Sequence, residues 1–286
     1  MVSLCENMCT GGCPLKRIGI SLLIVVGVAL LILNVFQSLH AENTQAVAAD
    51  DEELAETLDR LNPENGEVSY LDYLQYWALT HNEVRMAVIG SSVTNGKGAS
   101  SKDKNWPNLM LQNIQASDES LANTSLSNFG VNGAMIQDLL DNGTFDKLIK
   151  EKPDFIIIES SILNSHRKNE SLEDTNEAIT TAHRLVSEAL PTSKILFTSP
   201  NPATIKLDTD INDIGLIYQE YLESTENYIM SQGWNYVDIY TDIHSEIDEK
   251  GLTLEQTLDD GLHPNDLGYQ IWAEKLIQYM LVDRSL

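Results

Sequence analysis

Cysteine is scarce in this sequence and is confined to its first 13 residues. The 286-residue chain has only Cys5, Cys9 and Cys13. The part that follows them therefore holds neither a disulfide nor a cysteine metal site. Their regular spacing is compatible with metal binding or with acylation near a membrane. No histidine lies close by, so we predict no bound metal.

Basic residues are also few. The chain has 18 Lys and Arg against 43 Asp and Glu, which gives a formal net charge of −25 at pH 7. A surface this negative repels the phosphate backbones of nucleic acids and anionic lipid headgroups. We therefore expect no nucleic-acid partner, and we interpret the charge mainly as a source of solubility.

Long hydrophobic runs are rare too, with one exception at residues 18–36. Only Ser21 and Asn34 are polar in this run, and as a helix it would span about 28 Å, close to the hydrocarbon thickness of a bilayer. Lys16 and Arg17 precede the run, and acidic residues follow it. The positive-inside rule then predicts a cytosolic N-terminus and a domain outside the cytosol, at the cell surface or in a secretory lumen.

A cleaved signal peptide is the alternative interpretation of this run. The tripeptide at residues 46–48 resembles a cleavage site, and cleavage would make the protein secreted. The length of the run favours an uncleaved membrane anchor. We accordingly predict a cytosolic tail over 1–17, a transmembrane signal anchor over 18–36, an acidic linker with a helical lead-in over 37–83, and one catalytic domain over 84–286.

Short apolar runs alternate with helical patterns beyond residue 84. The predicted strands are 85–89, 126–129, 155–159, 194–198 and 236–240. The predicted helices are 106–116, 135–150, 175–190, 211–231 and 266–280. Strands that alternate with helices indicate an α/β fold with a parallel sheet covered on both faces.

Candidate catalytic residues follow the first three predicted strands. The turn GSSVTNGKG at residues 90–98 can expose the hydroxyl of Ser92 beside free backbone N–H groups. Gly133 follows the second strand and can present its N–H to an oxyanion, and Asn164 follows the third. Each feature alone also fits an ordinary turn or cap. The carboxyl ends of parallel strands meet at one edge of a sheet, however, so we expect these residues to lie together.

A histidine and a carboxylate near the C-terminus complete the pattern. Asp260 precedes His263 by three residues in the sequence DGLHPN, just before the last predicted helix. A serine nucleophile needs a base, and the base needs an acceptor that orients it. The sequence therefore predicts a catalytic triad of Ser92, His263 and Asp260.

The order and spacing of these residues resemble the sequence blocks of the SGNH, or GDSL-like, hydrolases. Residues 89–107 resemble the first block, Gly133 the second, Asn164 the third and the Asp260-x-x-His263 pair the fifth. The resemblance covers roughly residues 84–281. It implies a three-layer α/β/α, flavodoxin-like sandwich around a mostly parallel five-stranded sheet, preceded here by the N-terminal transmembrane helix.

The chain departs from the family pattern in two blocks. The family usually has Gly-Asp-Ser in the first block, whereas Ser91 stands here in place of the Asp. The third block usually reads Gly-x-Asn-Asp, and here the sequence SILNS at residues 161–165 holds one extra residue. His166 is a further polar candidate nearby, expected at the surface or at the rim of the substrate site.

The resemblance implies a serine esterase that needs no metal and no organic cofactor. Ser92, Gly133 and Asn164 would form its oxyanion hole. An anchored domain outside the cytosol favours an O-acyl, above all acetyl, ester on a carbohydrate as substrate. Two alternatives stay open: an O-acyltransferase with the same triad, and a non-catalytic glycan-binding domain on the same fold.

Overall fold

The computed structural model describes residues 31, 33–39, 51–204 and 211–286, and the chain divides into two units, Met1–Asp59 and Arg60–Leu286. Most of the predicted membrane anchor, the cytosolic tail and the three cysteines lie outside the described residues. Residues 31 and 33–39 are helical and exposed. Within the ranges that are described, no helix is both long enough and apolar enough to cross a bilayer.

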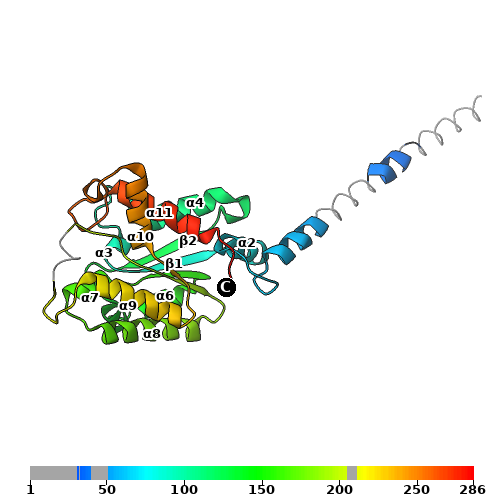
Figure 1. The fold of residues 1–286 in the computed structure, drawn as a ribbon. Helices are drawn as coiled ribbons and strands as arrows, with labels where there is room; N and C mark the ends of the chain where they lie inside the picture. The colour runs from blue at the N-terminus through cyan, green and yellow to red at the C-terminus, as the bar shows by residue number, and fades with distance from the viewer. Residues whose placement is uncertain (1–30, 32, 40–50, 205–210) are drawn as a thin grey trace, which may run out of the picture. The chain divides into compact units, whose positions relative to one another are not determined.

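A five-stranded parallel sheet forms the centre of the second unit (Figure 1). Its strands are β1 (Arg85–Gly90), β2 (Ser125–Gly130), β3 (Phe155–Glu159), β4 (Lys194–Thr198) and β5 (Tyr236–Val237). They lie in the order β2-β1-β3-β4-β5, and every neighbouring pair is parallel. This is the strand order of flavodoxin-like sheets, and it confirms the predicted parallel α/β sheet.

Helices cover both faces of the sheet. Figure 1 shows α4, α10 and α11 on one face and α6, α8 and α9 on the other. The helices of this unit are α2 (Tyr70–His81), α3 (Ser92–Asn95), α4 (Trp106–Ser117), α5 (Ile136–Asp141), α6 (Thr144–Glu151), α7 (Ile162–Arg167), α8 (Leu172–Ala189), α9 (Tyr218–Ser231), α10 (Ile239–Lys250) and α11 (Asp266–Met280). Short 3-10 helices lie at Lys102–Lys104, Glu119–Leu121 and Leu254–Thr257.

The strands divide their side chains between two hydrophobic cores. Successive side chains of a strand point to opposite faces of the sheet. In β1, Met86 and Val88 therefore join one core, while Ala87 and Ile89 join the other. β3 alternates in the same way and is buried along its whole length. A strand with both faces covered needs apolar side chains, which explains the continuous apolar run at residues 155–158.

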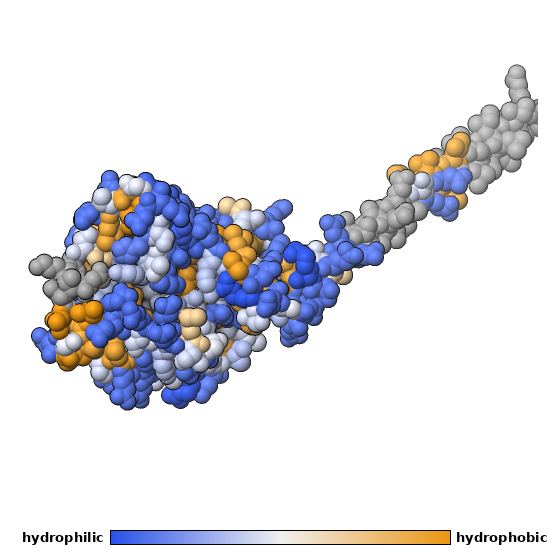
Figure 2. Space-filling model, in the orientation of Figure 1, coloured by the Kyte–Doolittle hydropathy of each residue, from blue (hydrophilic) through white to orange (hydrophobic). Residues whose placement is uncertain are grey.

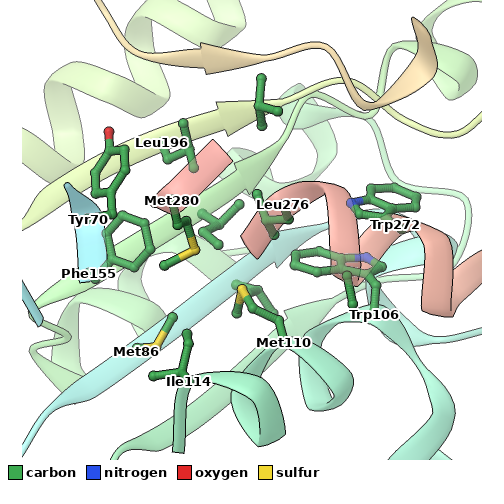
Figure 3. Packing of buried hydrophobic residues seen from close by; sticks show 14 of the residues in the cluster. Tyr70, Met86, Trp106, Met110, Ile114, Phe155, Leu196, Trp272, Leu276 and Met280 are labelled. Carbon is green, nitrogen blue, oxygen red and sulfur yellow. The ribbon is translucent and has the colours of Figure 1, made fainter. Parts of the chain in front are cut away.

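Aromatic residues pack with aliphatic side chains and methionines in the core beneath α4 and α11 (Figure 3). The Trp106 and Trp272 rings come one from each helix and stack with centroids 5.3 Å apart and an interplanar angle of 6°. α2 adds Tyr70, which packs on Phe155 of β3 at 4.9 Å. The predicted helical lead-in thus contributes side chains to the same core as the sheet.

Three predicted elements differ from the structure. The predicted strand 236–240 ends at Val237, because the Asp238 side chain accepts the N–H of Thr241 and caps α10. The predicted helix 135–150 is two helices, broken at Gly143 with φ +71°. The predicted helix 211–231 begins only at Tyr218.

Candidate active site

Ser92 follows the carboxyl end of β1 and is the first residue of α3. The first N–H groups of a helix have no acceptor within the helix, so the Ser92 N–H is free to point at a ligand. Two glycines let the backbone pack closely around this turn. A Cβ on Gly130 would lie 2.2 Å from the backbone nitrogen of Asn95, and a Cβ on Gly90 would collide with Thr94 and Glu159.

The structure brings the three residues of the predicted triad together. The Ser92 Oγ lies 3.0 Å from Nε2 of His263, although the two residues are 171 positions apart in the chain. On the other side of the ring, Nδ1 of His263 lies 2.8 Å from Oδ2 of Asp260 and 3.0 Å from Oδ1. His263 is buried, so its ring has a fixed place between the hydroxyl and the carboxylate.

Asp260 is held in its ionised form by hydrogen bonds. Its partial burial favours the protonated carboxyl. The backbone N–H and the ring of His263, together with the N–H of Leu262, donate to the carboxylate and outweigh that effect. They lower the pKa of Asp260 to about 2. Asp260 therefore carries a negative charge at neutral pH and can stabilise a protonated imidazole.

The loop that carries Asp260 and His263 is tied to the loop after β4. The buried Asn201 side chain donates to the carbonyl of Leu262 at 2.9 Å, and the N–H of Thr204 donates to the carbonyl of Gly261, also at 2.9 Å. Asn201 was not predicted to belong to the site. The only signal for it in the sequence is its position after the fourth strand, at the edge where the site forms.

The turn after β1 supports the histidine loop from the other side. A Cβ on Gly98, whose φ is +97°, would lie 2.4 Å from the carbonyl oxygen of Pro264 and 3.1 Å from the Cβ of His263. The Ser100 N–H and hydroxyl donate to Asp266 at 2.8 and 2.6 Å, which joins the turn to the first residue of α11. Gly98 and Ser100 belong to the sequence block that resembles the family, but their contacts were not predictable.

The two further oxyanion candidates lie on loops that touch each other. Gly133 is exposed on the loop after β2, with φ +73° and open space where a Cβ would stand. Asn164 lies in the first turn of α7, and its Nδ2 donates to the carbonyl of Ala134 at 3.0 Å. An amide nitrogen has two hydrogens. One N–H of Asn164 thus connects the two loops, and the other has no acceptor among the described residues.

His166 does not lie at the surface, which corrects that part of the prediction. It is buried, and its ring packs edge-on against Tyr218 and Tyr221 at 6.0 and 5.6 Å. It lies two residues beyond Asn164 on α7, and successive helical residues point in different directions. The ring of His166 is therefore part of the packing between α7 and α9.

Comparison with known proteins matches the chain to one enzyme family. The sequence pattern of the GDSL-like lipase/acylhydrolase family matches residues 88–271, which is more than half of the chain. No curated protein matches the chain. Several solved structures share its fold at low sequence identity, and at this level of identity the likeness shows the fold alone.

Three of these structures illustrate the likeness. A protein from Parabacteroides merdae assigned to the GDSL-like lipases is 16% identical, with a TM-score of 0.57, and the match covers 69% of this chain and 95% of that one. A mutant acetyl-xylooligosaccharide esterase from Geobacillus is 18% identical, with a TM-score of 0.54 and coverages of 69% and 94%. A two-domain esterase active on acetylated mannans is 16% identical, with a TM-score of 0.55 and coverages of 77% and 55%.

Proposed function

Since the chain belongs to the GDSL-like lipase/acylhydrolase family and is a serine ester hydrolase, we propose that it removes O-acyl groups, acetyl above all, from a carbohydrate. The observation that carries the proposal is the continuous contact from Ser92 through His263 to Asp260, with distances of 3.0 and 2.8 Å. A hydroxyl next to an imidazole, with a carboxylate on the other side of the ring, is the arrangement needed for nucleophilic attack on an ester carbonyl.

The first half of the reaction forms an acyl-enzyme. The Ser92 oxygen attacks the ester carbonyl while Nε2 of His263 takes the hydroxyl proton. Asp260 accepts the hydrogen bond from Nδ1 and stabilises the imidazolium without taking its proton. When the tetrahedral intermediate collapses, the bond to the sugar oxygen breaks, and His263 gives its proton to that oxygen. The sugar leaves with a free hydroxyl, and the acyl group stays on Ser92.

The second half of the reaction releases the acyl group. His263 takes a proton from a water molecule, and the water oxygen attacks the acyl-enzyme. His263 then returns the proton to Ser92, and the free acid leaves. In both halves the negative carbonyl oxygen is received by the backbone N–H groups of Ser92 and Gly133 and by the free N–H of Asn164. Donors of this kind stabilise the transition state more than the substrate.

A carbohydrate ester is the substrate class with the most support. The esterase active on acetylated mannans and the acetyl-xylooligosaccharide esterase have the same fold as this chain. The predicted anchor would hold the domain outside the cytosol, where polysaccharides are accessible. The first argument is an analogy of fold, and the second is an inference from the predicted location of the domain. Activity on acetylated oligosaccharides tests both.

Labelling of the active serine tests the proposal. The purified chain should react with a fluorophosphonate probe, and the label should map to Ser92. Acetylated xylo- and manno-oligosaccharides should release acetate faster than a p-nitrophenyl ester of a long-chain fatty acid releases its phenol. Transfer of acetate to an added sugar in preference to water would favour the acyltransferase. A folded chain with neither label nor turnover would favour the non-catalytic glycan-binding domain.

A further inference from the structure

One fully buried carboxyl group has no part in the reaction described above. Glu159 is the last residue of β3, and its side chain has no exposed surface. Burying a carboxyl group costs several kcal/mol unless hydrogen bonds or an opposite charge compensate for it. Within the described part of the chain, no Lys or Arg forms an ion pair with Glu159.

Hydrogen-bond donors from two loops surround this carboxyl group. Oε2 accepts the N–H of Ser91 at 2.7 Å and the hydroxyl of Thr94 at 3.3 Å. Oε1 accepts the N–H of Ser161 at 2.8 Å, and the hydroxyl of Ser161 lies 3.3 Å from Oε2. The two backbone N–H groups can only donate, one to each oxygen, so they match an ionised carboxylate, which only accepts. Burial acts in the opposite direction and raises the pKa of Glu159.

The two loops are those that carry the proposed nucleophile and one proposed oxyanion donor. Ser91 and Thr94 lie on either side of Ser92. Ser161 begins the turn into α7, and its carbonyl accepts the N–H of Asn164 at 2.9 Å. Ser161 has a φ of +56°, a conformation that is uncommon for residues other than glycine and has to be held by its surroundings. One carboxylate thus joins both loops.

Gly90 leaves space for the contact between Glu159 and the turn after β1. A Cβ on Gly90 would lie 2.6 Å from Oε2 of Glu159, so the glycine before the serine pair allows the carboxylate to reach the turn. The family usually has an aspartate at the position of Ser91. A second carboxylate there would lie beside Glu159, and two buried like charges repel each other.

We propose that Glu159 is a positioning residue, which fixes the distance between Ser92 and Asn164 by binding the backbone N–H groups of both loops. A small neutral residue at position 91 is then required, because a carboxylate there would repel Glu159. This inference rests on the proposed function. Glu159 does not touch the substrate. It acts through the geometry of the residues that do, so its loss should slow the chemical step without weakening substrate binding.

The test compares Glu159→Gln with Asp154→Asn. Asp154 is a matched control because it is a buried carboxyl directly before the same strand and accepts a backbone N–H, that of Arg85 in β1, at 2.8 Å. Glutamine keeps the shape of Glu159 but places an NH2 group against backbone donors. Turnover of an acetyl ester by Glu159→Gln should fall by about 10–100-fold with KM nearly unchanged. Asp154→Asn should lower the melting temperature and leave kcat within about twofold.

Two further variants keep the test decisive if Glu159→Gln does not fold. Thr94→Val removes one donor with little change of volume and should lower kcat by a smaller factor, again without a change of KM. Ser91→Asp should reduce kcat and the melting temperature in the wild-type chain, and the loss should be smaller when Glu159→Gln is also present, because the repulsion is then absent.

The possible outcomes separate the two proposals. If Glu159→Gln melts earlier but keeps its kcat, as Asp154→Asn should, Glu159 is structural and the inference is wrong. Full activity of Thr94→Val, together with equal effects of Ser91→Asp in both backgrounds, would also overturn it. If the wild-type chain shows neither labelling nor turnover, the proposed function itself fails, and the inference fails with it.

Discussion

At the scale of single residues, the two adjacent serines of the β1 turn differ in their partners. Both are buried, but only the hydroxyl of Ser92 lies against the imidazole of His263. The backbone N–H of Ser91 donates to Glu159 instead. One position along the chain thus separates a residue placed for chemistry from one placed for support, and variants of the two serines should behave differently.

Variants of the triad should be strongly non-additive. Ser92→Ala and His263→Ala should each abolish most esterase activity, and the double variant should be little worse than either, because the residues act as one unit. Asp260→Asn should also lower esterase activity, but the loss should be less complete, since the imidazole can still accept a proton in some orientations. Acetate release measures these effects. Ser91→Ala is the control and should keep most of its activity, and a loss equal to that of Ser92→Ala would contradict the assignment.

The role proposed for Asn164 predicts an effect on the rate rather than on binding. Asn164→Ala should lower kcat by about 10²–10³, because an oxyanion donor acts mainly in the transition state. Its contact with the carbonyl of Ala134 also joins two loops, so circular dichroism has to show that the fold is intact. Asn176→Ala is a matched control, since its amide joins α8 to α9 away from the site. An unchanged kcat in Asn164→Ala would mean that the third block is aligned wrongly.

At the scale of secondary-structure elements, the Ser100–Asp266 contact joins the turn after β1 to the start of α11. The hydroxyl and N–H of Ser100 lower the pKa of Asp266. A carboxyl with a lowered pKa in the folded state stabilises the protein above its unfolded pKa of about 3.9, and the contribution disappears as the pH falls through the folded value.

The stability of Asp266→Asn should therefore depend on pH. At pH 7 the variant should melt roughly 1–3 °C below the wild-type chain, a small shift because the contact is exposed to solvent. The difference should shrink as the pH falls below about 4. Thermal unfolding from pH 7 to pH 3 measures it. Ser100→Ala should show the same trend, and a difference that stays constant over this range would refute the role of the charge.

At the scale of the whole molecule, the sequence has a formal net charge of −25. The face shown in Figure 2 is largely hydrophilic. The predicted anchor and its orientation stay predictions, since residues 18–30 lie outside the described part of the chain. The proposed carbohydrate substrate depends in part on that orientation, which can be measured without knowing the substrate.

Protease protection should reveal the orientation of the folded domain. In sealed vesicles with their cytosolic face outward, residues 60–286 should resist added protease until detergent is present, because Lys16 and Arg17 favour a cytosolic N-terminus. A tag placed before Lys16 should be removed without detergent and serves as the control. Digestion of the intact domain in sealed vesicles would show that the predicted orientation is wrong.

The sequence by itself determined the order of the strands and the candidate residues of the site. Apolar runs of strand length mark β1, β3 and β4, because strands covered on both faces cannot carry many polar side chains. Ser92, Gly133, Asn164, Asp260 and His263 were all proposed from their positions after strands or before the last helix, because parallel strands place their carboxyl ends at one edge. Short-range patterns are enough for such inferences, since they depend on local chain geometry.

Only the tertiary structure decided which groups support those residues. No local pattern marks Glu159 as a partner of Ser91, or Asn201 as a partner of Leu262, because each contact crosses more than 60 residues of sequence. The end of β5 and the burial of His166 were also beyond the sequence, since both depend on what packs beside them. A buried polar group is placed by the need to satisfy its hydrogen bonds, and its donors are known only once the chain has folded around it.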